Sequence, residues 1–414
     1  MIQDPLDFEV PAPLRREFIF QTAGILPPHG ILFGFHTVRK TGEQAKRLGA
    51  SRVILITDET MVRLGYAGVV REAMEKEGLA VEVFGQVEAE PHMETADTLR
   101  AIVRGGKFDL VVGLGGGSPL DMAKLTSLAA TNDLPPLEMM EKKVARNPAL
   151  KKILIPTTSG TGSEVSMFFV ASAGRRKTIM GTPYAFPEIA IVDPGLTLSL
   201  PPRTTAVTGI DALSHALESL MNRLANPFFD ALGFAAAELV SRHLARATEN
   251  GRDLEARYHM SMASTMAMIS LSGTGGLYAH SISYVLAMFQ PIDHGTGCGV
   301  SLPYLMAFNL PVMEDKMALI ARSLGERIES LPPRAAGERA LERVRRLVAG
   351  LKMPVSLKEM GFRLADIPSM AKICLSRYPR PNNPRPMSEE DCRILFEAMW
   401  EGDLKKISGK ESES

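Results

Sequence analysis

FDLVVGLGGGSPLDMAKLTSLAA, residues 108–130, runs from an apolar strand-like stretch through a glycine cluster into a helical pattern. Four glycines permit close approach of a ligand to the backbone: Gly113, Gly115, Gly116 and Gly117. Ser118 and the following helix N-terminus would offer donors and a favourable dipole to a pyrophosphate. Asp121 either belongs to that site or complements the positive helix start. The cluster is not a complete GxGxxG fingerprint, so a tight turn without a ligand is the alternative.

Two further segments favour a nucleotide site. RVILITDETMVRLG, residues 52–65, is an apolar strand that ends in Asp58. A carboxylate at that position can accept hydrogen bonds from a ribose 2′-OH and would repel a 2′-phosphate, which favours NAD over NADP. Helix capping is the alternative for Asp58. The hydroxyl-rich and glycine-rich segment at residues 156–166 suits a loop that folds over ribose, phosphate or nicotinamide, although such turns are common.

The order of the patterns predicts two domains. β-branched runs alternate with amphipathic helices through the first half, at residues 52–57, 62–77, 80–84, 95–105 and 108–114, which is typical of a parallel α/β sheet. Further strand-like stretches at residues 153–156, 165–172 and 188–193 would extend or edge this domain. Pro201 and Pro202 then precede an almost wholly helical sequence. We therefore predict an α/β domain at residues 1–202, an all-α domain at residues 203–414, and an active site in the cleft between them.

Asp211 and His215 lie four residues apart in GIDALSHALESL, so a helix would present both side chains on one face. His280 lies in a second helical segment, and His294 lies in DHGTG, where we expect a turn. Together these side chains predict a divalent metal site with one carboxylate and three imidazoles. The donor set suits Fe(II), Zn(II), Co(II) or Mn(II) and does not name the metal. A hydrogen-bonded Asp–His pair without a metal is the alternative.

Composition narrows the function to small-molecule chemistry. The 414 residues carry 47 basic and 47 acidic side chains, so no overall field attracts nucleic acid or an anionic membrane. No apolar run approaches the ~20 residues of a membrane span, and the acidic N-terminus lacks the pattern of a signal peptide, so we expect a cytoplasmic protein. Cys298, Cys374 and Cys392 are scattered, which argues against disulfides and a thiolate metal site. Cys298 is expected to pack as a small apolar side chain.

GGGSPLDMAK, PTTSGTGSEVS, GIDALSHALE and the segments around His280 and His294 occur in an order that resembles the iron-containing alcohol dehydrogenase family. The resemblance spans nearly the whole chain. It implies Asp211, His215, His280 and His294 as ligands of a divalent metal, with Fe(II) favoured and Zn(II) as the alternative. It also implies a set of NAD(H) contacts: Asp58, Gly115, Gly116, Gly117, Ser118, Asp121, Thr157, Thr158, Ser163 and Lys177.

The sequence departs from the family pattern at two positions. Tyr284 stands where many relatives have a second histidine one turn after the His280 ligand, so a proton-relay role passes to Tyr284 or is absent. A tyrosine with an ordinary pKa near 10 is a poor base at neutral pH. Glu90 stands where relatives often have an asparagine, which puts one cofactor contact in doubt.

The residues and the resemblance together predict hydride transfer between nicotinamide C4 and a small primary alcohol or aldehyde whose oxygen meets the metal. We also expect a homodimer or a higher homo-oligomer, and Phe168 as a wall of the pocket. Arg203 is expected to be structural rather than a contact for an anionic substrate. Three alternatives stay open: a hydroxyacid–oxoacid transhydrogenase, a non-redox NAD and metal enzyme of the dehydroquinate synthase type, and a nucleotide-binding sensor without turnover.

Overall fold

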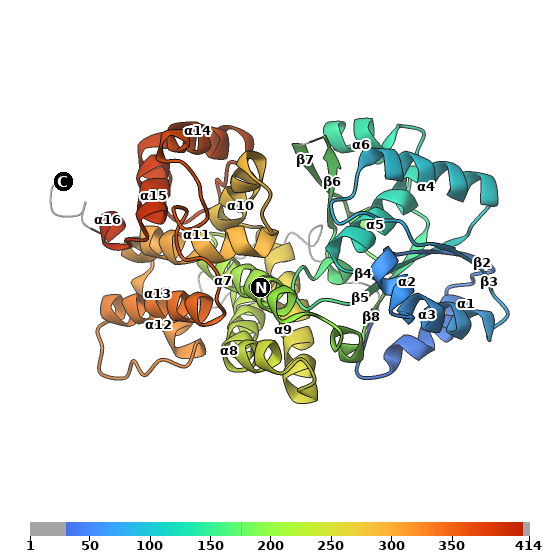
Figure 1. Cartoon of the computed structure of the whole chain (residues 1–414), viewed down its shortest axis with the longest axis horizontal. Helices are drawn as coiled ribbons and strands as arrows, with labels where there is room; N and C mark the ends of the chain where they lie inside the picture. Colours follow the sequence, from blue (N-terminus) through green and yellow to red (C-terminus); the bar gives the residue numbers. More distant parts are fainter. Residues whose placement is uncertain (1–29, 175, 409–414) are drawn as a thin grey trace, which may run out of the picture.

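A six-stranded parallel sheet forms the centre of the N-terminal part of the chain in this computed structural model, which describes residues 30–174 and 176–408. The strand order is β1-β8-β5-β4-β2-β3, and all five pairings are parallel. The strands are β1 (Gly30–Phe33), β2 (Arg52–Ile56), β3 (Ala80–Phe84), β4 (Leu110–Gly115), β5 (Lys151–Pro156) and β8 (Ile189–Val192). Figure 1 shows this α/β part beside a separate helical part, as the sequence predicted.

Both faces of the sheet are buried, because helices cover each of them. In β2, Val53 and Leu55 contribute to one apolar cluster, and Ile54 and Ile56 contribute to the other. This explains why the strands are continuously apolar instead of alternating. The covering helices are α1 (Thr41–Arg47), α2 (Glu59–Arg63), α3 (Tyr66–Glu75), α4 (Met93–Gly106), α5 (Gly117–Thr131) and α6 (Pro136–Lys142).

A separate antiparallel hairpin follows β5. Its strands are β6 (Phe168–Ala173) and β7 (Arg176–Gly181), and they pair only with each other. We expected a strand-like stretch at residues 165–172 that extends or edges the α/β domain; β6 is that strand, and it belongs to a two-stranded sheet of its own and not to the main sheet. The backbone N–H of Val170 instead donates to Asp121 at 2.9 Å, and that of Ser172 donates to the carbonyl of Pro91 at 2.8 Å. These bonds hold the hairpin over the start of α5, where it forms a wall of the site described below.

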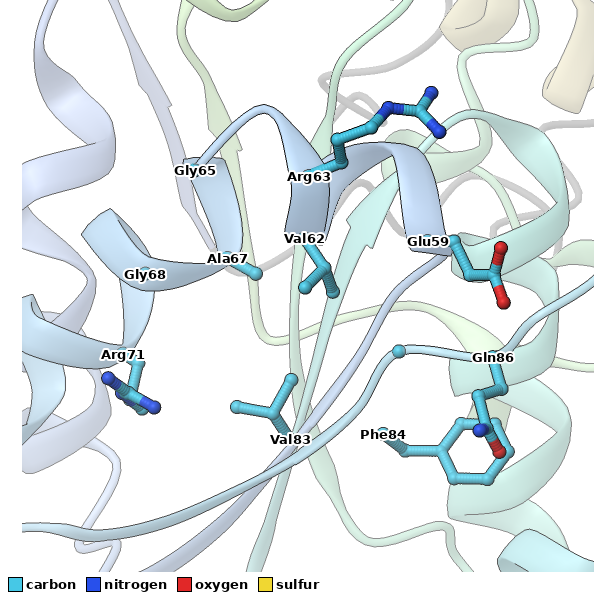
Figure 2. A pocket seen from close by; sticks show the side chains of 11 residues that line it. Glu59, Val62, Arg63, Gly65, Ala67, Gly68, Arg71, Val83, Phe84 and Gln86 are labelled. Carbon is cyan, nitrogen blue, oxygen red and sulfur yellow. The ribbon is translucent and has the colours of Figure 1, made fainter.

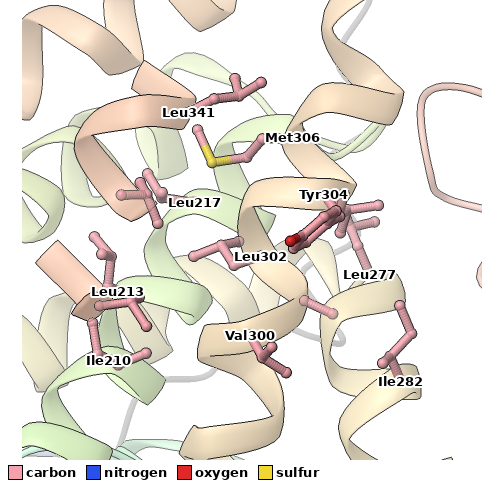
Figure 3. Close-up of a cluster of buried hydrophobic side chains, with 14 of the residues drawn as sticks. Ile210, Leu213, Leu217, Leu277, Ile282, Val300, Leu302, Tyr304, Met306 and Leu341 are labelled. Carbon is pink, nitrogen blue, oxygen red and sulfur yellow. The ribbon is translucent and has the colours of Figure 1, made fainter. Parts of the chain in front are cut away.

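The C-terminal part consists of helices: α7 (Pro202–Met221), α8 (Pro227–Glu249), α9 (Leu254–Thr274), α10 (Tyr278–Phe289), α11 (His294–Asn309), α12 (Glu314–Ser323), α13 (Pro333–Gly350), α14 (Ile367–Arg377), α15 (Glu389–Glu401) and α16 (Lys405–Ser408). One large apolar cluster unites them, and Figure 3 shows side chains of α7, α10 and α11 within it, among them Leu213, Ile282 and Leu302. Among the described residues, no helix is long and apolar enough to cross a membrane. The domain boundary at residues 202 and 203 stays a prediction.

Helix α9 connects the two parts. Val165 and Ala190 of the α/β part pack with Met268 and Leu271 of α9 in a small buried cluster. Gly162 makes the approach possible, because its φ is +58° and a Cβ there would lie 2.2 Å from the Cβ of Met268. The loop after β5 is thereby pressed against the helical part, and the cleft between the two parts lies directly beside it.

Candidate metal and dinucleotide site

The four predicted metal-binding side chains come together on the side of the helical part that lines a cavity shared with the α/β part. Asp211 and His215 project from α7, His280 from α10, and His294 is the first residue of α11. The Nε2 atoms of His215 and His294 each lie 3.7 Å from Asp211 Oδ1, and His280 Nε2 lies 3.9 Å from the same atom. The rings of His215 and His280 stack with centroids 4.8 Å apart. The helical spacing in α7 and the fold of α10 and α11 thus bring three imidazole nitrogens within 3.9 Å of one carboxylate oxygen.

These separations suit a small divalent ion. Donors at about 2.1 Å from a tetrahedral metal lie about 3.4 Å from one another. The three nitrogens lie 3.7–3.9 Å from Asp211 Oδ1, a little beyond that separation. Asp211 Oδ1 and His280 Nε2 are buried and have no hydrogen-bond partner among the described residues. Because a buried polar atom without a partner costs free energy, two such atoms pointing at one site favour an ion there.

Cys298 is a fifth donor close to this site. Its sulfur lies 3.7 Å from His294 Nε2, and ligand atoms of Asp211, His280, His294 and Cys298 all lie within 4.8 Å of one another. Burial raises the pKa of the Cys298 thiol well above its usual value, so the thiol keeps its proton. A protonated thiol is a poor metal ligand. His215 does not belong to that set of four, although its Nε2 lies 3.7 Å from Asp211 Oδ1. We regard His215 as the better fourth donor, because its imidazole is neutral at pH 7 and the Cys298 thiol keeps its proton.

Two of the three imidazoles, those of His215 and His294, are set up as neutral ligands. Burial lowers the pKa of His215 to about 4 and that of His294 to about 3. Burial opposes ionisation of Asp211, but the adjacent imidazoles, His215 first, hold the pKa of Asp211 below its usual value. At neutral pH the site therefore presents one carboxylate and the two neutral imidazoles of His215 and His294, the protonation states in which these groups bind metals. Burial lowers the pKa of His280, but the charge and hydrogen bond of Glu218 outweigh it and hold that pKa above its usual value, so metal binding at His280 is coupled to the loss of a proton.

Glu218, a residue that we did not predict, holds His280. Its carboxylate is fully buried and accepts hydrogen bonds from the Leu277 N–H at 2.6 Å, the His280 N–H at 3.1 Å and His280 Nδ1 at 2.8 Å. Burial opposes its ionisation, but the charge and hydrogen bond of His280 and the Leu277 N–H lower the pKa of Glu218 to about 2. A permanent carboxylate keeps the His280 proton on Nδ1 and leaves Nε2 free for a metal. Glu218 follows Asp211 by seven residues, so it extends the polar face of α7, and that spacing was a usable signal.

Ser283 performs the equivalent task for His294. Its hydroxyl donates to the His294 carbonyl at 2.8 Å and lies 3.0 Å from His294 Nδ1, so Nδ1–H donates to it and Nε2 faces the site. The prediction of a turn at His294 was wrong, because α11 begins there. The glycines in DHGTG serve close helix packing instead. A Cβ on Gly295 would lie 2.1 Å from the Val207 carbonyl, and a Cβ on Gly297 would lie 2.5 Å from Ser283 Oγ.

The predicted dinucleotide residues lie at the carboxyl end of the sheet. Gly115 ends β4, Gly116 is the N-cap of α5, and Ser118 lies in the first turn of that helix. Thr157 directly follows β5, and its N–H donates to the Gly115 carbonyl at 2.9 Å. Thr158 Cγ2 lies 3.6 Å from where a Cβ on Gly116 would stand. The two loops therefore form one surface at the N-terminus of the 15-residue helix α5, where backbone amides can bind a pyrophosphate.

Three charged candidates surround this surface. Asp121 accepts from Ser163 Oγ at 2.6 Å, which joins two of the predicted contacts. Asp58 caps α2 by accepting from the Met61 N–H at 3.0 Å, as the alternative interpretation required, and its other oxygen lies 3.2 Å from where a Cβ on Gly115 would stand. One carboxylate oxygen can cap the helix while the other faces the turn, so the two interpretations are compatible.

Lys177 lies on β7 and pairs with Glu90, with Nζ and Oε1 3.1 Å apart. Glu90, the position that departs from the family pattern, therefore compensates the charge of a predicted cofactor contact. Both residues line the rim of the cavity described next.

A cavity of about 320 Å³ joins the metal ligands to the dinucleotide loops. Asp211, His215, His280 and His294 lie on one side, Gly117, Ser118 and Asp121 on another, and the β6–β7 hairpin contributes Phe168, Val170 and Ile179. Phe168 is therefore a pocket wall, as predicted. The ring of Tyr284 stacks on that of His294 at 5.1 Å, and burial raises the pKa of Tyr284 well above its usual value. The Tyr284 hydroxyl therefore keeps its proton at neutral pH.

A larger groove of about 800 Å³ lies at the other edge of the sheet, between α2, α3 and β3. Figure 2 shows Val62 and Val83 on its walls and Arg63 directed away from Val83. Its lining contains neither a predicted metal ligand nor a predicted cofactor contact. Volume alone therefore does not identify the functional site, and the smaller cavity between the two parts is the candidate.

Comparison with known proteins gives consistent matches over almost the whole chain. The model of the family described as "Iron-containing alcohol dehydrogenase" matches residues 28–194, and that described as "Fe-containing alcohol dehydrogenase family, C-terminal" matches residues 205–400. A long-chain-alcohol dehydrogenase from Geobacillus thermodenitrificans is 38% identical over 365 residues, 87% of this chain and 92% of the relative. An NAD-dependent methanol dehydrogenase from Bacillus methanolicus is 32% identical over 88% of this chain and 96% of its own. The solved structure of an alcohol dehydrogenase from Oenococcus oeni has a TM-score of 0.87 at 28% identity, with 91% of this chain and 99% of that chain covered.

Proposed function

The chain belongs to the iron-containing alcohol dehydrogenase family, and from that premise we propose that it interconverts a small alcohol and its aldehyde with NAD(H) and one divalent metal ion. The observation that carries the proposal is the convergence of Asp211, His215, His280 and His294 on one wall of the cavity whose opposite wall is the glycine turn of β4 and α5.

We assign Asp211, His215, His280 and His294 to the metal, with Fe(II) favoured by the family name. When bound, the metal supplies Lewis-acid polarisation of the substrate oxygen, and the nicotinamide supplies or accepts the hydride at C4. The protein itself holds the metal-donor atoms in place and sets the tautomers of the imidazoles. Glu218 and Ser283 hold the protons of His280 and His294 on Nδ1, so that no rearrangement of tautomers is needed.

The N-terminus of α5 and the loop after β5 are assigned to NAD(H). Backbone amides of Gly116 to Ser118 would bind the pyrophosphate, and Asp58 would accept from the ribose 2′-OH. Thr157, Thr158, Asp121, Ser163 and Lys177 complete the proposed set of contacts. Phe168, Val170 and Ile179 line the cavity with apolar surface, which limits access of water to the reacting atoms.

Tyr284 is assigned a packing role against His294. Its hydroxyl donates to no atom among the described residues and remains protonated at neutral pH, so it is a proton donor at most and not a base. The two relatives named above act on alcohols as different as a long-chain alcohol and methanol, so their names do not fix the substrate. A cytoplasmic location and a homodimer or higher homo-oligomer belong to the same proposal.

The test is NADH oxidation across a panel of aldehydes, with protein stripped of metal and then reconstituted anaerobically with Fe(II) or Zn(II). The proposal predicts oxidation of one NADH per aldehyde reduced, and only after metal is added. Turnover with retained cofactor and no consumption of free NADH would identify a transhydrogenase. NAD binding without turnover under any condition would favour a non-redox enzyme or a sensor.

A further inference from the structure

Arg380 is the one cation of the cavity that forms no ion pair at bonding distance with a carboxylate of the described residues. Lys177 pairs with Glu90 there, Asp121 accepts hydrogen bonds from Ser163 and Val170, and Asp211 faces the three imidazoles. Arg380 lines the same cavity, in the proline-rich loop between α14 and α15. In the described part of the chain, no carboxylate oxygen lies within 4.0 Å of its guanidinium nitrogens.

The guanidinium is anchored by one edge only. Its Nε donates to Ser281 Oγ at 2.8 Å, and Ser281 in turn donates to the Tyr378 carbonyl at 2.8 Å. Because Ser281 directly follows His280, this bond fixes the guanidinium beside a proposed metal ligand. The terminal nitrogens, which form the face that suits a planar anion, donate to no protein atom among residues 30–174 and 176–408.

Two glycines lie close to this side chain. A Cβ on Gly276 would lie 3.7 Å from Arg380 Nη1, and Gly275 adopts a φ of +83°. Both glycines line the cavity with Arg380. The guanidinium therefore lies next to glycine backbone, and it is partly exposed.

Glu218 does not accept a hydrogen bond from Arg380. Its Oε2 lies 3.3 Å from the same Gly276 Cβ position, so the two charges are close enough to attract each other. However, the Glu218 oxygens already accept three hydrogen bonds, from Leu277 N–H, His280 N–H and His280 Nδ1. The attraction helps to keep a buried Glu218 ionised, and it leaves the donors of Arg380 unused.

We propose that Arg380 binds an anionic group of the substrate, so that the enzyme prefers small aldehydes and alcohols that carry a carboxylate a few bonds from the reacting carbon. This inference rests on the proposed dehydrogenase function. Phosphates of NAD(H) are the other source of anionic oxygens, but their proposed site is the N-terminus of α5, on the opposite domain. Arg380 lies beside His280, on the wall where the reacting oxygen is expected. The terminal N–H groups of arginine match a carboxylate in two parallel hydrogen bonds.

The test compares 4-oxobutanoate with its methyl ester, which has the same aldehyde and nearly the same shape without the charge. NADH-dependent kcat/KM is measured with metal-loaded, full-length protein for both aldehydes. The variants are Arg380→Gln, Arg380→Lys and the control Arg377→Gln. Arg377 is exposed on α14, three residues before Arg380, and does not line the cavity.

We expect wild type to prefer the carboxylate over the ester by about tenfold or more, and Arg380→Gln to lower that ratio by roughly 10- to 100-fold, mainly through KM. Arg380→Lys should retain part of the preference, since it keeps the charge without the paired donors. Arg377→Gln should leave the ratio as in wild type, and the KM for NADH should not follow the substitutions at 380.

Three results would overturn the inference: a wild-type preference for the ester, an unchanged ratio in Arg380→Gln, or a raised KM for NADH at an unchanged ratio, which would assign Arg380 to a cofactor phosphate. If Arg380→Gln does not fold, the inference is tested by the ratio of kcat/KM for the carboxylate to kcat/KM for the ester in wild type and in Arg380→Lys. Failure of the proposed function is distinguishable, because wild type would then oxidise NADH with neither aldehyde.

Discussion

Replacing Glu218 with glutamine tests how this chain holds its metal. Glu218 Oε2 accepts from Leu277 N–H and His280 Nδ1, and Oε1 accepts from His280 N–H. A glutamine amide has one acceptor oxygen and one donor group of nearly the same size. At least one buried donor therefore loses its acceptor in Glu218→Gln, and the negative charge disappears in either orientation of the amide.

The orientation of the glutamine amide decides how far the metal affinity falls. With the amide oxygen at the Oε2 position, the proton stays on His280 Nδ1 and one hydrogen bond is lost. With the amide reversed, the NH2 group faces Nδ1, the imidazole proton moves to Nε2, and the ligand atom is blocked. We expect metal affinity to fall about 10-fold in the first case and about 100-fold in the second. The unfolding free energy of the metal-free protein should fall by about 1–3 kcal/mol, since a buried donor is left unpaired.

The assay is competition between the protein and a chromophoric chelator for Co(II) or Zn(II), with folding checked by circular dichroism. The matched control is Glu238→Gln. Glu238 lies on α8 with a partly exposed side chain paired to Arg242 at 2.7 Å, so the control removes the same charge from the same domain. A metal dissociation constant in Glu218→Gln that matches those of wild type and the control would refute the argument.

Three other substitutions probe separate parts of the account. Tyr284→Phe should lower kcat by less than about tenfold, because the protonated hydroxyl is not a base; a 100-fold loss in steady-state turnover with metal retained would assign it a proton-transfer role. Asp58→Ser should raise the ratio of kcat/KM with NADPH to kcat/KM with NADH by about tenfold or more. Serine keeps the helix cap and removes the charge that repels a 2′-phosphate. An unchanged ratio would show that Asp58 acts only as a cap. Burial raises the pKa of Glu164 to about 7, so the folded protein holds a proton between about pH 4.5 and 7 that the unfolded chain releases, and this residue lowers stability as pH rises through that window. The unfolding free energy of Glu164→Gln should therefore rise relative to wild type between pH 4.5 and 7.5, by at most about 3 kcal/mol, and its Tm should rise relative to wild type in thermal unfolding of the metal-free protein. A Tm difference that does not change with pH would contradict the shift.

The fold was largely predictable because its signals are local. Continuous apolar strands alternate with amphipathic helices, and glycine or proline punctuates the connections, so the α/β part and the helical part followed from the sequence. Strands β1 and β7 were missed, since each is recognisable mainly through its pairing partner, Ile189–Val192 for β1 and Phe168–Ala173 for β7. Pairing between distant segments leaves little trace in a single strand.

The site residues were predictable where several of them lie on a single helix. Asp211 and His215 share a helix face, and Glu218 continues that face, so the seven-residue spacing could have identified it. The glycines around His294 were misinterpreted, because their small size serves helix packing and not a turn. Arg380 had no local signal, since its place beside His280 depends on how the α14–α15 loop folds back over α10.

The most direct measurement is an anaerobic Fe(II) titration of metal-free protein, with the rate of aldehyde-dependent NADH oxidation followed at each addition. The account predicts no turnover without metal, a linear rise, and a plateau at one ion per chain, with His280→Ala failing to reach that plateau at the same metal concentration. Full turnover in the absence of metal, or a His280→Ala titration that overlays wild type, would contradict the assignment of Asp211, His215, His280 and His294 as the metal site.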